Sequence, residues 1–199
     1  MLLDAGRPDD AEPYLRSAYA ARVRSSGAEH SNTLTVEANL GAMLRAQGKL
    51  EEAADVLRSR LAARRRVLGD DHPNVFETLD ALSSVLRDLG RLDESARLGA
   101  ETMERADRVL APDHWHRALF RRGYARTLIA QSRFAQAEEL LLEAQRITDA
   151  AFGATSDNAR KSRAVLVELY ETWNAAQPSE RLATAAARWR VLAGPASPP

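Results

Sequence analysis

Histidines are the residues of this chain whose spacing first suggests chemistry. His30, His72 and His114 follow one another at a constant interval, and His114 and His116 flank Trp115. A zinc ion needs nitrogen ligands at about 2.0–2.1 Å, whereas equivalent positions in successive packed helices are separated by roughly 10 Å. The three spaced histidines are therefore predicted to cap or pack helices rather than to share one metal ion.

Other candidates for catalysis are also weak. Glu51-Glu52 and Glu138-Glu139 are paired carboxylates at expected helix starts, where negative charge interacts favourably with the helix dipole. The chain has no cysteine, which excludes disulfides, thiolate metal sites and cysteine nucleophiles. No glycine-rich segment carries the lysine of a phosphate-binding loop. We therefore predict that the protein is not an enzyme and has no catalytic residue, metal site or cofactor.

Charge and hydropathy favour neither nucleic acid nor membrane as a partner. In the 199 residues, 28 basic side chains balance 28 acidic ones, so no global field attracts a polyanion. No apolar run approaches the roughly 18 residues of a membrane span, and the N-terminus lacks the features of a signal peptide. The composition predicts a cytoplasmic protein with protein partners.

Several landmarks recur at the same interval as these histidines, every forty-two residues, and identify an internal repeat. A unit of this kind cannot bury its apolar face alone, so successive units must stack on one another. The two clearest series are Gly6, Gly48, Gly90, Ser132 and Asn174, and Ala11, Ala53, Ser95, Ala137 and Ser179.

Between these landmarks the apolar residues follow a helical period. One helix is predicted to end before Gly48, and a second to cover residues 50–68, with Ala53 inward and Arg64 outward. We call the first helix of each unit helix A and the second helix B. Gly69 is expected to end helix B, and Pro73 to open the next helix A behind a polar cap.

The predicted fold is all-α, an α-solenoid of antiparallel helix pairs in a single domain over residues 1–192. Only residues 193–199, rich in proline and small side chains, are predicted to be disordered. The expected units are residues 1–30 (partial), 31–72, 73–114, 115–156 and 157–192 (degenerate).

The repeated residues resemble the tetratricopeptide repeat. That family has a large residue, a small residue, another large residue, a turn glycine and an alanine in fixed order. The usual unit has roughly 34 residues, and the longer unit of this chain is similar to the kinesin-light-chain subclass. A HEAT-like array is the alternative, but the turn glycine argues against it. The matching strings are Leu40, Gly41, Leu44, Gly48 and Ala53; Leu82, Ser83, Leu86, Gly90 and Ser95; and Tyr124, Ala125, Leu128, Ser132 and Ala137.

The resemblance implies a right-handed superhelix with a concave groove lined by helix A of each unit. Two interpretations of the groove charges stay open. Equivalent residues of adjacent units, such as Asp80 with Arg122 or Arg126 with Glu168, could form salt bridges. Alternatively, the arginines could bind an acidic peptide or a C-terminal carboxylate. The candidate groove residues are Asn39, Arg45, Glu77, Asp80, Arg87, Arg122, Arg126 and Glu168.

The resemblance thus predicts a protein–protein interaction scaffold that binds a peptide or partner protein in this groove. The alternative is a regulatory or sensory repeat region of a larger signalling protein, such as a bacterial serine/threonine kinase. A helical-repeat enzyme is the least favoured class, because helix A carries only scattered acidic residues.

Three features of the repeat carry further expectations. Gly99 stands where Leu57 and Leu141 stand, which predicts loose packing there. Arg60 occupies a position that is alanine or threonine in other units. Small residues such as Gly41 and Ala53 are expected to meet where helices A and B pack closely.

The N-terminal unit is expected to lack most of its helix A. Residues 1–4 align with residues 43–46, the last turn of a helix A, so Tyr14, Leu15 and Ala18 of the following helix would lack their usual cover. We expect either a longer protein, of which this chain is a part, or self-association through this N-terminal edge.

Overall fold

The computed structural model describes residues 8–27 and 30–194, and within these ranges it contains nine α-helices and no strand. The predicted helix turn at residues 1–4 and most of the predicted disordered tail lie outside the described residues. The helices are α1 (Pro8–Ser26), α2 (Ser31–Ala46), α3 (Leu50–Leu68), α4 (Pro73–Asp88), α5 (Leu92–Val109), α6 (Trp115–Ala130), α7 (Phe134–Phe152), α8 (Asp157–Ala176) and α9 (Glu180–Ala193).

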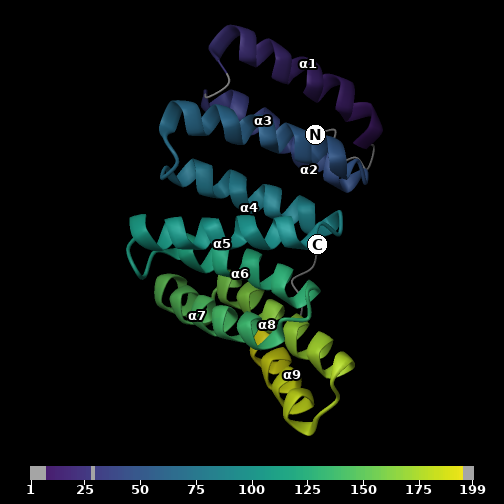
Figure 1. Ribbon diagram of the computed structural model, residues 1–199, viewed down its shortest axis with the longest axis vertical. Coiled ribbons are helices and arrows are strands. Elements are labelled where there is room, and N and C mark those ends of the chain that lie inside the picture. The colour runs from purple at the N-terminus through teal and green to yellow at the C-terminus, as the bar shows by residue number, and fades with distance from the viewer. Residues whose placement is uncertain (1–7, 28–29, 195–199) are drawn as a thin grey trace. The chain divides into compact units, whose positions relative to one another are not determined.

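Helix starts recur with the period of the sequence. Helices α2, α4, α6 and α8 are the A helices and begin one full repeat apart, and α1, α3, α5 and α7 are B helices with the same spacing. Within residues 8–90, and likewise within residues 91–194, consecutive helices run antiparallel (Figure 1). The all-α class and the arrangement in antiparallel helix pairs are therefore as predicted.

A residue with a positive φ angle ends the tight turns that follow α2, α4 and α6. Gly48 has φ 72° and Gly90 has φ 74°, a conformation that glycine adopts without steric cost. Ser132 takes the equivalent place with φ 59°. The recurring glycine is therefore explained by the turn that separates the two helices.

Asn174 does not occupy such a turn, contrary to its place in the repeat. It lies inside α8, which continues to Ala176, and α9 begins at Glu180, four residues later than the period predicts. Without a glycine at this point the helix continues until the Gln177-Pro178 segment ends it. The Asn174 side chain accepts a hydrogen bond from the backbone N–H of Ser179 at 2.9 Å, and Ser179 caps α9.

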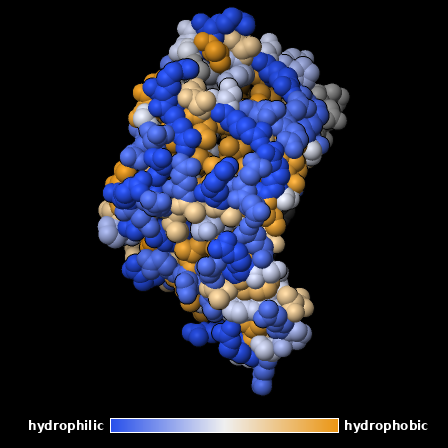
Figure 2. All heavy atoms as spheres, viewed as in Figure 1, coloured by the Kyte–Doolittle hydropathy of each residue, from blue (hydrophilic) through white to orange (hydrophobic). Residues whose placement is uncertain are grey.

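The chain divides into two compact units, residues 1–90 (unit 1) and residues 91–199 (unit 2). In unit 1, buried apolar residues come from α2, α3 and α4, and include Leu44, Leu57 and Phe76. In unit 2, one apolar core joins α6, α7, α8 and α9, with Leu141 and Leu169 completely buried. Hydrophilic residues predominate on the face of unit 1 shown in Figure 2, with hydrophobic residues visible between them. The single domain over residues 1–192 remains a prediction.

Arg64 is buried, and its predicted outward orientation is wrong. Only 2% of this residue is exposed, and its guanidinium donates from Nη1 to the carbonyl oxygen of Asn74 at 2.5 Å and to Thr78 Oγ1 at 2.7 Å. The side chain thus reaches from the end of α3 to the first turns of α4. The helical period predicted an outward position because arginine is charged, but the start of α4 supplies two acceptors for Nη1 of the buried side chain.

Two predictions about glycine packing are also corrected. At Gly41 an added Cβ would meet no atom within 4 Å, so this glycine is not required by close contact with α3. Gly99 is not loosely packed, because a Cβ there would lie 2.7 Å from Cδ2 of Tyr124. The ring of Tyr124 on α6 fills the space that leucine fills at Leu57 and Leu141.

Polar contacts that the sequence did not predict join α1 to the other helices of unit 1. Tyr19 donates to Glu37 at 3.2 Å, and Glu37 forms a buried ion pair with Arg60, Nε to Oε2, at 3.2 Å. The unusual Arg60 therefore neutralises a buried carboxylate. Glu12 lies 2.5 Å from Lys49 Nζ, and hydrogen bonds from Lys49 and then Arg16 lower the pKa of Glu12 to about 2.

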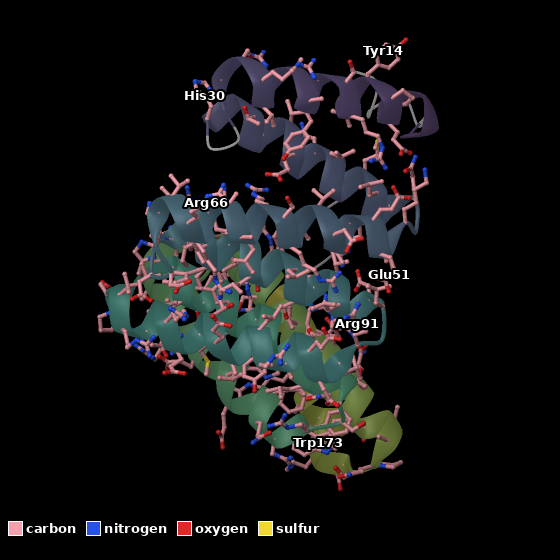
Figure 3. All side chains as sticks on the ribbon, turned by 45° about the horizontal axis from the view of Figure 1, so that its top comes forward. Tyr14, His30, Glu51, Arg66, Arg91 and Trp173 are labelled. Carbon is pink, nitrogen blue, oxygen red and sulfur yellow. The ribbon has the colours of Figure 1, made fainter. Side chains whose placement is uncertain are left out.

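Of the three α1 residues expected to lack cover, only Tyr14 is plainly exposed. Tyr14 is 69% exposed and points away from the helix into solvent (Figure 3), whereas Leu15 and Ala18 are half-buried. Self-association through this edge remains a prediction.

Candidate functional site

His72 and His114 cap helices, as predicted. Nδ1 of His72 accepts the backbone N–H of Asn74 at 3.1 Å, and Nδ1 of His114 accepts that of His116 at 3.3 Å. These bonds satisfy N–H groups that have no partner inside the helix. For His30 the capping role stays a prediction. No group of three or more histidine, aspartate or glutamate side chains is placed to hold a metal ion among the residues that the structure describes.

In unit 1 the candidate groove residues lie on α2 and α4. Asn39, Arg45 and Glu77 are exposed, and Asp80 and Arg87 are half-buried. Arg45 Nε donates to Asp88 Oδ2 at 2.5 Å and so joins the two A helices. Arg87 donates to Ser84 Oγ at 2.9 Å on its own helix.

In unit 2 the candidate residues lie on α6 and α8. Arg126 Nε donates to Glu168 Oε2 at 3.1 Å, which confirms the salt bridge predicted from their 42-residue spacing. Arg122, one turn before Arg126, is half-buried. Asp80 and Arg122 belong to different units, and their pairing stays a prediction.

Both observed pairs between A helices are exposed to solvent. The side chains of Arg45 and Asp88 are 44% and 28% exposed, and those of Arg126 and Glu168 are 43% and 44% exposed. Exposed ion pairs contribute about 0–1 kcal/mol to stability. A carboxylate from another molecule could therefore replace Asp88 or Glu168 at little cost.

A second set of charged residues links helix B of one repeat to helix A of the next. Arg121 donates to both oxygens of Asp107, at 2.9 and 2.7 Å, and Arg117 Nε donates to Asp107 Oδ1 at 2.6 Å. One repeat later, Arg163 Nη2 donates to Asp149 Oδ1 at 3.0 Å. We call the contact between Asp107 and its two arginines the Asp107 clamp. Asp107 and Asp149 occupy the same position of successive repeats, as do Arg121 and Arg163, so the 42-residue spacing carries a signal for this contact.

Tyr170 on α8 is buried beside a carboxylate. Its hydroxyl donates to Glu138 Oε1 at 2.5 Å. Burial, and then the hydrogen bond to Glu138, raise the pKa of Tyr170 to about 12.

We expect this tyrosine to make the stability of the chain depend on alkaline pH. The folded chain holds the phenol proton of Tyr170 more tightly than the unfolded chain does. The contribution of Tyr170 to the free energy of unfolding is therefore complete below pH 10 and is lost as the pH rises toward about 12. Urea unfolding across this range should show a steeper loss of free energy in the wild type than in Tyr170→Phe. Equal slopes for the two proteins would contradict the assignment.

A pocket with a volume of about 410 Å³ lies within unit 2, at the ends of three helices. Its lining comes from the first two turns of α6, the end of α7 and the start of α8. The lining residues are Trp115, Arg122, Thr148, Phe152 and Asn158. Among the residues predicted for the groove, only Arg122 belongs to this lining.

The helix spacing defines the class of protein, a repeat array of antiparallel helix pairs. The family model for the tetratricopeptide repeat matches residues 1–66 and residues 39–108. The chain belongs to the tetratricopeptide repeat family, as the turn glycines and their small partners predicted. No curated protein matches the chain.

Solved structures with the same fold include kinesin-light-chain-like repeats. A point variant of the nearly identical TPR-like repeats of Podosopora anserina aligns with a TM-score of 0.74 and 20% identity, over 95% of this chain and 88% of that chain. The structure without that substitution aligns with a TM-score of 0.70 and 20% identity, over 94% of this chain and 88% of that chain. BtubC (BKLC) from P. vanneervenii aligns with a TM-score of 0.71 and 15% identity, over 95% of this chain and 71% of that chain. The repeat fold is therefore of the kinesin-light-chain-like kind.

None of the helices in the described part of the chain is long and apolar enough to cross a membrane.

Proposed function

We propose that this protein is an interaction scaffold whose A helices bind an extended segment of a partner protein. The observation that carries the proposal is the exposure of polar side chains on helices whose other sides form the core. Asn39 and Arg45 on α2, and Arg126 on α6, are exposed, while Leu44 and Leu128 on the same helices are buried. Tetratricopeptide repeats are protein-interaction modules, and within each unit the exposed sides of the A helices offer hydrogen-bond donors and charges to a partner.

The partner segment is proposed to be acidic. Arginine presents a planar set of donors that fits a carboxylate, and Arg45 and Arg126 each already hold one in this structure. Because these pairs are exposed and weak, an incoming carboxylate can compete with Asp88 or Glu168. The same arginines thus form salt bridges within the chain when no partner is bound and bind carboxylates of the partner when it is.

This proposal predicts a salt-sensitive interaction that depends on Arg122 and Arg126. Peptides selected from a random linear display library on the full chain should carry acidic residues. Their affinity should fall at least about tenfold in Arg122→Glu combined with Arg126→Glu, and fall again as the salt concentration is raised, because screening weakens exposed charge pairs. Fluorescence anisotropy with synthetic versions of the selected peptides measures both effects.

A matched control reverses the charge of an arginine that lies outside the A helices. Arg146 on α7 pairs with Glu143 on the outside of the same unit, so Arg146→Glu should leave the affinity unchanged. Peptides that bind the double variant as well as the wild type would contradict the role of the arginines. A regulatory role within a larger signalling protein would use the same surface and is not separately favoured by any contact described above.

A further inference from the structure

Only one side of α9 is packed within unit 2. Leu182 and Ala186 are buried in the core that α9 shares with α6, α7 and α8, and the helix lies at the edge of this unit (Figure 1). The residues on the opposite side follow one another at intervals of three or four, as on one face of a helix, and all of them are exposed. This outer face consists of Glu180, Ala183, Thr184, Ala187, Arg188 and Val191.

The composition of the outer face suits contact with another helix. Val191 is 81% exposed, the largest fraction among the large hydrophobic side chains that the structure describes. The outer side of a surface helix usually carries charged and polar residues, whereas the middle of this face carries Ala183, Thr184 and Ala187. Short side chains let the axes of two helices approach to roughly 8–10 Å. A second helix can therefore lie close against this face and cover Val191.

The charged residues of α9 fall into two groups. Arg181 and Arg190 lie near carboxylates of α7 and α8, and so interact within unit 2. The side chains of Glu180 and Arg188 form no hydrogen bond or ion pair with another residue that the structure describes. These two residues lie about two helical turns apart, with Thr184 midway between them. The outer face thus carries one negative and one positive charge without a partner.

The two charges complement each other under a two-fold rotation. If two copies of α9 lie antiparallel with their Thr184 residues at the centre, Glu180 of each copy lies beside Arg188 of the other. Dimers with two-fold symmetry use the same patch on both subunits, so every such pair is made twice. A second copy of the chain supplies this matching pattern of charge by symmetry, which makes it the partner that the face fits.

We propose that the outer face of α9 binds the same face of a second copy of this chain, as an antiparallel helix pair centred near Thr184. The contact covers Val191 and places an ion pair between Glu180 and Arg188 on each side of the centre. A helix of 14 residues is about 21 Å long. Because one pair of such helices makes a small interface, the dimer is weak and its population depends on concentration.

The proposed dimer is independent of the peptide surface, because α9 is not one of the A helices that we propose for peptide binding. Both surfaces can be occupied at once, and the dimer then presents two peptide surfaces. A partner with two binding segments would gain affinity from this arrangement.

Sedimentation velocity of the full chain over a range of micromolar concentrations tests the proposal. The wild type should shift from monomer to dimer as the concentration rises. Glu180→Arg and Arg188→Glu each bring like charges together, and each should weaken the dimer at least about tenfold. An equimolar mixture of these two variants should restore the dimer, because every changed residue then meets an opposite charge. A mixture that stays monomeric would contradict the antiparallel pairing.

The controls separate this face from other surfaces of the chain. Val191→Asp should also weaken the dimer, whereas Leu142→Asp should not, because Leu142 is an exposed residue of α7 outside this face. Circular dichroism of these variants should match the wild type, since the changed side chains are exposed. A wild type that stays monomeric throughout would overturn the proposal. A dimer that is lost in Tyr14→Glu and kept in Glu180→Arg would also overturn it, because such a dimer uses the N-terminal edge.

Discussion

Replacing Gly99 with leucine is expected to destabilise the protein by about 2 kcal/mol, although it restores the residue found at this place in other repeats. A Cβ at this position would lie 2.7 Å from Cδ2 and 3.0 Å from Cγ of Tyr124. These atoms lie close to the backbone of α6, so they cannot move aside as a flexible side-chain end could. Urea unfolding of the full chain measures the loss.

A double-mutant cycle tests the cause of this loss. Tyr124→Ala alone should also destabilise the chain, because it empties the space above Gly99. Gly99→Leu combined with Tyr124→Ala should cost clearly less than the sum of the two single changes, since the leucine then occupies the vacated space. A Gly99→Leu variant that is more stable than the wild type would show that the repeat, and not the Tyr124 ring, determines this position.

Removing the carboxylate of the Asp107 clamp is expected to destabilise the protein by about 2–3 kcal/mol. Asp107→Ala would leave the guanidinium of Arg121 buried, with its side chain only 8% exposed, and deprived of both carboxylate oxygens. The expected loss lies below that of a fully buried ion pair because the Asp107 side chain is 31% exposed. Urea unfolding of Asp107→Ala and wild type gives the difference.

An exposed ion pair of the same unit provides the control. Arg146 and Glu143 lie three residues apart on α7, and Arg146→Ala should leave the free energy of unfolding almost unchanged because the pair is exposed. If Asp107→Ala costs no more than Arg146→Ala, the clamp contributes nothing beyond a surface pair.

Part of the candidate site could be predicted from spacing alone. The pair of Arg126 and Glu168 followed from their separation by one full repeat. Arg45 pairs with Asp88 across 43 residues, one more than the repeat, so the equivalence of positions in successive repeats does not predict this pair. The sequence does not predict the contact between Trp115 and Phe152, because the two residues lie on different helices and no local pattern connects them.

The sequence by itself determined the family and, up to α8, the helices and turns, because these depend on local chemistry that repeats. Turn glycines, polar caps and a 3.6-residue apolar period act within a few residues, so the limits of α3 and the start of α4 at Pro73 could be predicted directly. Only the tertiary structure decided which polar residues are buried and which small residues have their free space filled by a side chain of another helix. Arg64 is buried because the start of α4 supplies its acceptors, and Gly99 is required because Tyr124 arrives from α6. Such contacts join residues of different helices, and the local sequence around a residue does not specify which residue of another helix will pack against it.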